Sequence, residues 1–432
     1  MSETNTAGVA ARNSRGIGRR FQRPSLVTVV DLGFLPAVLV VLIVVLSIAS
    51  PYFLTGHNMV NILSQTAVLG IVAAGTTFVI IGGDLDLSVG ANLALSGVVA
   101  AYAMTTITHS IAIGVLLGLA VGLGFGLVNG FVSTYLRVPS FITTLGMMVI
   151  GDGIAVSLSS GAVVGGLPGG FNDLSNAQLL GVPSIVWLMV VVFVVGYVAL
   201  HRTGFGLRTY AVGGNQQAAR LSGLRVERTR IVNFVICALA TSVAGLALAS
   251  QVQAGQPNAG TIYTLYGTAA VVLGGTSLYG GRGGMVRTVL GVVLIGSLQN
   301  GLGLLGVSYS NQQVAVGIVF ILAASSELLR RKIASASRPS PMTGAVMADD
   351  DSQARHSQTD AELVGATART PSALPTAAVA SALSSLDPVT PASQQRAQPR
   401  TQPSVHPSTQ PSSSTPSVST PTPTTGKGAM HV

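Results

Sequence analysis

The chain has 432 residues, and only 9% of them are charged, against about 25% in a typical soluble domain. Between residues 31 and 332 there are only 12 Lys and Arg and seven Asp and Glu, separated by long runs of Val, Leu, Ile, Ala and Gly. This composition nearly excludes a soluble protein, and continuous apolar runs of about 20 residues disfavour a porin-like barrel. The sequence therefore predicts an all-α, polytopic membrane protein with its membrane domain at 31–332.

The N-terminal segment, residues 1–30, carries five arginines and one glutamate directly before the first long apolar run. A basic start before an apolar run is also typical of a secretory signal, and Ser47–Ser50 resembles a cleavage site. The apolar run Leu32–Ala49 is, however, longer than the roughly 7–15 residues of a signal peptide's hydrophobic region. We therefore expect an uncleaved first span that follows a cytoplasmic segment.

Hydropathy predicts about ten transmembrane helices. Only Gly83–Asp86 separates the second apolar segment from the third, so one of these two could be broken or re-entrant rather than a full crossing. Removing a pair of spans would leave the sides of the later loops unchanged, so eight or ten crossings both stay open. The predicted segments are 31–50, 60–82, 87–107, 110–134, 139–158, 182–200, 231–253, 261–281, 285–307 and 311–329.

The basic residues predict the orientation of the chain in the bilayer. When the N-terminus is placed in the cytoplasm and ten spans alternate, all 12 Lys and Arg between residues 137 and 332 fall on the cytoplasmic side. The positions of the basic residues behind the net charge of +9 therefore fit an orientation in the membrane, and the charge does not indicate nucleic-acid binding. Residues 333–432 hold 13 of the 20 prolines with many Ser and Thr, which predicts a disordered cytoplasmic tail.

Acidic residues at membrane depth are functional candidates. Asp84 and Asp86 lie between two apolar segments, and Ser88 and Gly90 follow them. Such carboxylates are costly unless they reach water, a cation or backbone donors. Asp86 could cap the next helix, take part in a gate or relay protons, and all three alternatives stay open. Asp152 lies inside a predicted span and is either a functional acid or a residue at the outer water boundary.

Two further features lie inside the predicted spans. The amides of Asn129, Gln299 and Asn300 could line a permeation path for a polar solute, or they could bond helix to helix. Glycines recur every four residues from Gly114 to Gly130, which places small side chains on one helical face. This pattern predicts either static packing within the chain or a sliding or dimer contact.

The largest cytoplasmic loop before the tail is His201–Arg230, which contains six arginines. Gly213–Asn215 has the residues of a turn and a helix cap, residues 216–221 favour a short helix, and Gly223 supplies a stop. The loop could offer a docking helix to a cytoplasmic partner, or it could only fix the orientation of the chain.

Three glycine-containing blocks stand out within residues 31–330: Ala74–Ile80 with Asp86–Gly90, Ala211–Asn215 with Ala218–Gly223, and Gly274–Ser277 with Gly280–Gly284. Together they resemble the permease subunits of bacterial ATP-binding-cassette (ABC) importers for monosaccharides, of the ribose, xylose, arabinose and galactose type. The first block is similar to the hallmark that follows the family's second span, the second to its coupling loop, and the third to a block near the end of such permeases.

The resemblance implies a bacterial inner-membrane permease, expected to be a homodimer with cytoplasmic termini, that forms the path of a sugar or similar polar solute. It also implies an extracytoplasmic solute-binding protein and a cytoplasmic ATPase, whose cleft would receive the short helix of the loop. Gln217 departs from the family, because many importers carry an acidic residue at this position. The implied coupling residues are Gly213, Gly214, Asn215, Gln217, Ala218, Ala219, Arg220 and Gly223, and the implied gating or structural motif is Asp84, Asp86, Ser88 and Gly90.

The chain lacks the phosphate-binding loop Gly-x-x-x-x-Gly-Lys-Ser/Thr, because neither of its two lysines, Lys332 and Lys427, precedes Ser or Thr. We therefore expect ATP to bind to a partner subunit, and we expect no catalytic residue, metal site or cofactor in this chain. The single Cys237 is expected to be a small buried hydrophobe. An ion-coupled secondary transporter that uses one of the three acidic residues above is the main alternative. A membrane-embedded enzyme is a further alternative, but the predicted spans offer few candidate catalytic residues.

Overall fold

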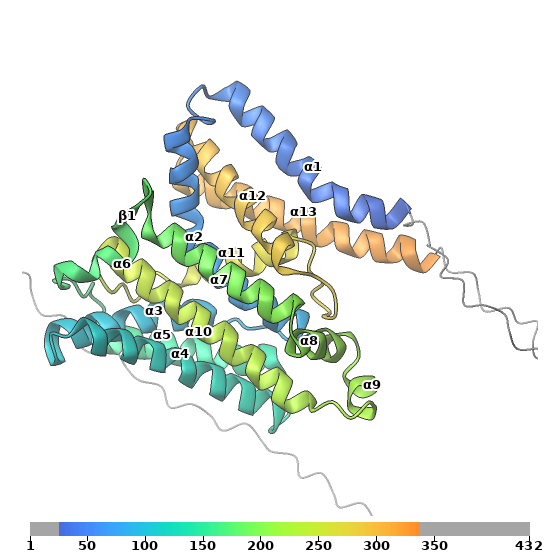
Figure 1. Cartoon of the computed structure of the whole chain (residues 1–432), viewed down its shortest axis with the longest axis horizontal. Helices are drawn as coiled ribbons and strands as arrows, with labels where there is room; N and C mark the ends of the chain where they lie inside the picture. Colours follow the sequence, from blue (N-terminus) through green and yellow to red (C-terminus); the bar gives the residue numbers. More distant parts are fainter. Residues whose placement is uncertain (1–25, 337–432) are drawn as a thin grey trace, which may run out of the picture. The chain divides into compact units, whose positions relative to one another are not determined.

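The computed structural model describes residues 26–336 (Figure 1). This part of the chain is almost wholly helical, so the all-α prediction is confirmed. A π-helical turn, η1 (Ala103–Ile107), continues α3, and a 3-10 turn, η2 (Gly169–Phe171), and an antiparallel hairpin, β1 (Gln178–Leu179) with β2 (Val182–Pro183), lie between α5 and α7. The α-helices are α1 (Leu26–Ala49), α2 (Gly56–Ile81), α3 (Val89–Tyr102), α4 (Ile111–Thr134), α5 (Ser140–Leu158), α6 (Asp173–Asn176), α7 (Ser184–His201), α8 (Gly204–Gly214), α9 (Gln216–Leu221), α10 (Val226–Val252), α11 (Thr261–Leu273), α12 (Met285–Leu304) and α13 (Tyr309–Ala336).

Seven of the described helices are long and apolar enough to cross a membrane, namely α2, α3 with η1, α4, α5, α7, α10 and α12. Three shorter apolar stretches, Leu35–Ala49, Thr261–Leu273 and Tyr309–Leu322, fall on the three remaining predicted segments. Each predicted segment thus coincides with an apolar helix, and the polytopic membrane fold is confirmed. Of the predicted basic N-terminal segment and tail, residues 1–25 and 337–432 lie outside the described residues.

The structure differs from the sequence prediction in three places. α11 ends at Leu273, earlier than predicted, because Gly274 and Gly275 follow it and Gly275 has a φ of +82°, which favours glycine. The loop between α7 and α10 contains two helices, α8 and α9, where one was predicted. The short helix α6 and the hairpin between α5 and α7 were not predicted at all.

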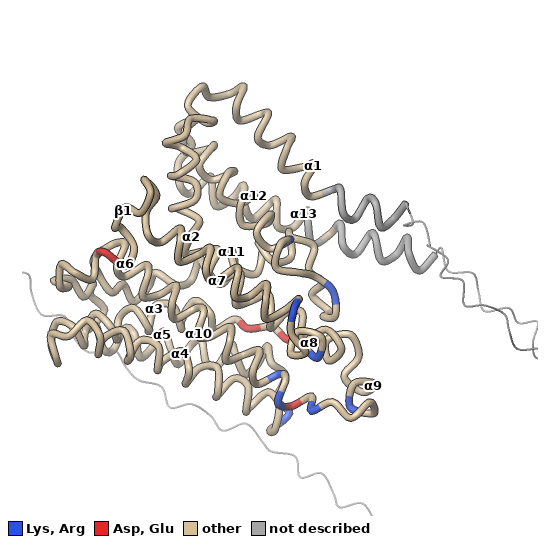
Figure 2. Tube along the Cα trace, viewed as in Figure 1, with Lys and Arg blue, Asp and Glu red and all other residues tan. Residues whose placement is uncertain are grey.

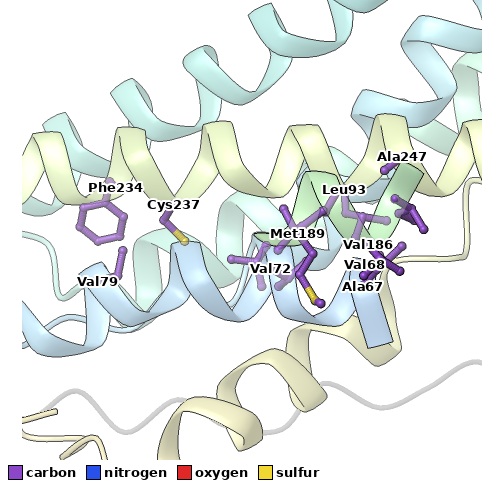
Figure 3. Close-up of a cluster of buried hydrophobic side chains, with 14 residues drawn as sticks. Ala67, Val68, Val72, Val79, Leu93, Val186, Met189, Phe234, Cys237 and Ala247 are labelled. Carbon is purple, nitrogen blue, oxygen red and sulfur yellow. The ribbon is translucent and has the colours of Figure 1, made fainter. Parts of the chain in front are cut away.

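The core forms where α2 and α10 pack together. α10 packs against α2, α3 and α4, and α2 also packs against α7, α11 and α12. Small side chains such as Ala67, Cys237 and Ala247 lie between larger ones such as Val72 and Phe234, and all are buried (Figure 3). Cys237 is therefore the small buried hydrophobe that the sequence predicts.

The glycine repeat of α4 lies against neighbouring helices of the same chain. Gly114 faces η1 and the end of α3, and the four later glycines of the repeat face α10. A Cβ on Gly126 would lie 2.5 Å from the Cα of Val235, and one on Gly130 would lie 2.9 Å from the Cα of Ile231. The repeat therefore serves packing within the chain, and the alternative of a glycine-lined dimer contact is wrong. The other face of α4 is exposed and apolar, as expected of a helix in contact with lipid.

Candidate coupling and gating site

The second and third glycine-containing blocks meet the turn between the two parts of the first block at one point in the fold. The turn after α2 contributes Gly83, the end of α8 contributes Gly213, and the loop between α11 and α12 contributes Gly280 and Gly281. A Cβ on Gly280 would lie 2.7 Å both from the carbonyl oxygen of Gly213 and from the Cα of Gly83. The N–H of Gly281 donates to the carbonyl of Ile81, the last residue of α2, at 2.8 Å. We call these four glycines the glycine junction.

Glycine is required at this junction for two reasons. Gly83, Gly280 and Gly281 have φ values of +84°, +81° and +69°, a region that side chains disfavour. Gly213 has an ordinary φ, but its Cβ would overlap the carbonyl of Ile81. The backbones of three distant segments therefore touch without intervening side chains, so that a shift of α8 reaches the end of α2 directly.

Two polar contacts fix α8 to its neighbours. The hydroxyl of Tyr210 donates to the carbonyl of Gly283 at 3.0 Å. Burial raises the pKa of Tyr210, while the charge of Arg287 lowers it by less, so the hydroxyl stays protonated and able to donate. The hydroxyl of Thr209 donates to Oδ1 of Asn233 on α10 at 3.1 Å. These contacts tie α8 both to the third block and to α10.

α9 is the short helix that the sequence predicts. Asn215 is its N-cap and accepts the N–H of Ala218 at 2.9 Å. Gly223 lies just after the helix with a φ of +82° and reverses the chain. Ala219 is buried against Val212 of α8 and against the start of α10. The Ala pair thus has two environments, because Ala218 is exposed and Ala219 belongs to the small core that holds α9 in place.

The outer surface of α8 and α9 is exposed and partly apolar. Leu207 of α8 is 73% exposed and Leu221 of α9 is 84% exposed, and the side chains of Gln217 and Arg220 on α9 are exposed as well. We call these four residues, with Ala218, the coupling surface. Figure 2 shows that the Lys and Arg positions of the described residues gather at this end of the helices. An exposed apolar patch in a basic region outside the candidate spans is typical of a protein contact.

Asp84 forms a buried ion pair with Arg230 from the first turns of α10. Nε and one Nη of Arg230 donate to the two carboxylate oxygens at 2.8 and 2.6 Å. The side chains of Asp84 and Arg230 are only 5% and 14% exposed. This two-pronged contact is the strongest geometry for such a pair, and it links the turn after α2 to α10. The sequence analysis did not predict the partner, because 146 residues separate the two positions.

Asp86 begins a chain of buried hydrogen bonds at the start of α3. Its Oδ1 accepts both the N–H and the hydroxyl of Ser88, at 2.9 and 2.6 Å. The Ser88 oxygen in turn accepts from Nδ2 of Asn129 on α4 at 2.8 Å. Asp86 therefore binds the residue that precedes α3, and it accepts no N–H from within that helix. The first turn of α3 is held from elsewhere, because Gly90 donates its N–H to Thr264 of α11 at 3.0 Å.

The three amides proposed for a permeation path are not brought together. Asn129 is fully buried beside Ser88, and its Oδ1 has no hydrogen-bond partner within the described part of the chain. Asn300 pairs reciprocally with Asn58 of α2 at 2.8 and 3.0 Å. Gln299, next along α12, is half-buried beside Tyr266 of α11. Two of the three amides thus make helix-to-helix hydrogen bonds.

Asp152 lies on α5, where most side chains are exposed. Its side chain is partly buried. Within residues 26–336 no side chain forms a hydrogen bond or an ion pair with it. Asp152 thus differs from Asp84 and Asp86, whose carboxylates are both engaged.

Comparison with known proteins assigns the sequence to a family. A family model described as "Branched-chain amino acid transport system / permease component" matches residues 58–324. The chain belongs to this permease family. Ribose import permease protein RbsC of Bacillus subtilis (strain 168) is 44% identical over 296 residues, which cover 68% of this chain and 91% of the relative. No solved structure matches the chain.

Two Escherichia coli (strain K12) proteins are also similar to this permease. L-arabinose transport system permease protein AraH is 37% identical over 333 residues, which cover 77% of this chain and 98% of AraH. Probable ABC transporter permease protein YphD is 38% identical over 299 residues, covering 69% and 90% of the two chains. The chain is thus a multi-pass membrane protein of a transport-permease family. These relatives support the importer prediction over the ion-coupled alternative.

Proposed function

We propose that this permease is the membrane subunit of an ABC importer and forms the path of a monosaccharide or a similar polar solute. The observation that carries the proposal is the placement of α9. This helix offers an exposed surface at one end of the spans, and α8 joins it to the glycine junction. A partner that pushes on the coupling surface would therefore move the ends of several spanning helices.

The route of this motion follows the contacts. A displacement of α9 moves α8, because Ala219 and Val212 share one small core. α8 then presses on the end of α2 at Ile81 through Gly213. Arg230 and Asp84 carry the same displacement into α10. α2 and α10 are the two central helices, so this route would couple the coupling surface to the packing around any solute path.

The partner that pushes would be an ATPase. The chain has no lysine in the context of a phosphate-binding loop, so ATP would bind and be hydrolysed on the other subunit. The exposed side chains of Leu207 and Leu221 would enter an apolar cleft of that subunit, because exposed apolar patches mark protein contacts. Gln217 offers an amide there in place of a carboxylate.

Further elements of the proposal follow from the family and from the distribution of charge. The basic end of the helices would face the cytoplasm, with both termini on that side of a bacterial inner membrane. A solute-binding protein would deliver the solute from the other side. Two copies of the permease would enclose the path, since the exposed apolar faces of α4 and α5 leave room for a second copy as well as for lipid.

The solute class rests on the relatives, whose names specify ribose and L-arabinose. A pentose presents several hydroxyl groups, and amide side chains are suitable partners for them. Asn129, Gln299 and Asn300 are our candidates for the polar positions near the path. A change in the packing of α2 and α10 would have to expose the two that are buried.

The experiment is ATP-driven uptake of labelled pentoses by vesicles that contain this chain with its ATPase and binding protein. The test variant is Leu221→Asp, and the matched control is Leu180→Asp. Leu180 is equally exposed, at 83%, but lies in the hairpin that precedes α7, whereas α8 and α9 follow that helix (Figure 1). Loss of a buried interface leucine costs about 2 kcal/mol, so we expect ATPase binding about 30-fold weaker for Leu221→Asp and unchanged for Leu180→Asp.

Two results would contradict the proposal. Equal ATPase binding by both variants would remove the coupling surface from the interface. Uptake that continues without ATP hydrolysis and collapses with an ion gradient would restore the ion-coupled alternative. In that case Asp152, the one membrane-depth carboxylate of the three candidates without a partner among the described residues, would be mutated first.

A further inference from the structure

A cavity lies between the end of α4 and the start of α10, outside the glycine junction. Its volume is about 370 Å³. The residues that line it are Tyr135, Arg225, Glu227, Arg228, Ile231 and Val232. Tyr135 follows the last residue of α4, and Arg225 precedes the first residue of α10. The cavity therefore lies where two candidate spans leave the membrane.

The charge of the cavity comes from two free arginines. Arg225 and Arg228 are exposed and form no ion pair within the described part of the chain. The carboxylate in the wall, Glu227, is already bound to Arg220 at 2.7 Å. Two guanidinium groups thus face one cavity without a protein anion to neutralise them. Guanidinium groups bind phosphate oxygens with two parallel hydrogen bonds.

An apolar wall continues from these arginines along the spans. Ile231 and Val232 of α10 are only partly exposed and close the inner side of the cavity. On α4, Phe131 is 52% exposed and Tyr135 is 58% exposed, with their ring centroids 5.3 Å apart. Phe131 lies in a candidate span and Tyr135 directly follows it, and tyrosine is typical of the interface between bilayer and water.

We propose that this cavity binds the headgroup of an anionic phospholipid. The phosphate would lie between Arg225 and Arg228, and an acyl chain would extend along Phe131. Basic pockets between spanning helices at the cytoplasmic side are suited to such headgroups. A free phosphate ion offers the same charge but cannot use the apolar wall, so the wall selects a lipid.

A lipid at this position would stabilise the start of α10. The first turns of α10 carry Glu227, which holds Arg220 of α9, and Arg230, which holds Asp84. A lipid bound to Arg225 and Arg228 would fix this segment from the membrane side. This last step depends on the proposed function, whereas binding of the lipid does not.

The test uses the purified full-length chain in a neutral detergent. Binding of phosphatidylglycerol is measured by native mass spectrometry for the wild type, for Arg225→Gln with Arg228→Gln, and for Arg202→Gln with Arg208→Gln. The last pair is a matched control, because it removes the same charge from exposed arginines that do not line the cavity. Loss of two basic contacts predicts roughly tenfold or more weaker binding for the cavity variant only.

Four outcomes would overturn the proposal. Equal weakening in both double variants would show a general effect of net charge. Binding of phosphatidylcholine as tight as that of phosphatidylglycerol would show that the arginines do not select an anion. Competition by inorganic phosphate or by the chain-free headgroup at similar concentration would show a phosphate site rather than a lipid site. Binding of the ATPase is measured on the same variants, and a loss of ATPase binding without a loss of lipid binding would assign the arginines to that protein contact instead.

Discussion

Replacing Gly213 by alanine is the most direct test of the glycine junction. A Cβ at this position would overlap the carbonyl oxygen of Ile81 and lie 2.8 Å from the backbone nitrogen of Gly281. Both neighbours are backbone atoms, which cannot rotate away as the end of a flexible side chain could. The hydrogen bond between these same two atoms is 2.8 Å long. Alanine would therefore push α8 away from α2 and weaken this bond.

The magnitude follows from these two effects. Overpacking costs about 1–3 kcal/mol, and the loss of one buried hydrogen bond adds about 1 kcal/mol. The sum, about 2–4 kcal/mol, equals or exceeds a typical coupling free energy of about 1–3 kcal/mol, or about 5–150-fold. We expect ATP-driven uptake to fall by roughly tenfold or more. The ATPase should still bind within about twofold of the wild-type affinity, because the added methyl group meets Ile81 and Gly281 rather than the exposed coupling surface.

The assay measures ATP hydrolysis, ATPase binding and solute uptake in the same proteoliposomes. Gly214→Ala is the matched control, because no atom lies within 4 Å of the Cβ that it adds. Alanine is also the better helix former there by about 1 kcal/mol at most, so this variant should transport normally. The two substitutions are chemically identical and lie at adjacent positions of one helix end.

Two results would refute this reasoning. Equal uptake by the Gly213 and Gly214 variants would show that the close backbone contact has no part in coupling. Loss of ATPase binding in the Gly213 variant alone, with an unchanged unfolding temperature in detergent, would place Gly213 in the partner interface rather than at the junction.

The ion pair predicts that Arg230→Gln lowers the free energy of unfolding by about 3 kcal/mol, because it leaves the buried carboxylate of Asp84 unpaired. Adding Asp84→Asn should recover part of this loss, and thermal unfolding in detergent of both variants checks the sign. Asn215→Ala removes the cap of α9 at a cost of about 1 kcal/mol, which should weaken ATPase binding about fivefold in a titration, whereas Gln216→Ala should not change it. Asn300→Leu leaves Oδ1 of Asn58 on α2 without a donor and should lower stability by about 1–3 kcal/mol, and a double-mutant cycle with Asn58→Leu would measure the coupling of the pair.

The sequence predicts the spanning helices well because apolar length is a local property. Each of the ten predicted segments coincides with an apolar helix. The cap and the short helix of the loop are local as well, and both are confirmed at Asn215 and α9. Hydropathy did not predict where a helix ends when glycines interrupt an apolar segment. Gly274 and Gly275 end α11 inside the segment 261–281 that hydropathy predicts as one span.

The candidate site was harder to predict, because its contacts join distant parts of the chain. Asp84 stood out as a costly carboxylate, but no local pattern identifies Arg230 as its partner. The sequence also favours no single role for Asp86, whereas the structure gives it Ser88 as its partner. The glycine junction depends on three segments that meet only in the folded chain. A hint was nevertheless present, because each of the three segments carries a pair of adjacent glycines, at 82–83, 213–214 and 280–281.

The glycine repeat of α4 limits the motions that this permease can use. Its glycines lie four residues apart, which is about 6 Å along a helix. A slip of α4 along α10 by less than that repeat would place larger side chains where Gly126 and Gly130 now touch backbone. The interface therefore resists small shifts of α4 along α10. We therefore expect α4 and α10 to move together during transport, with any bending at the turns at their ends.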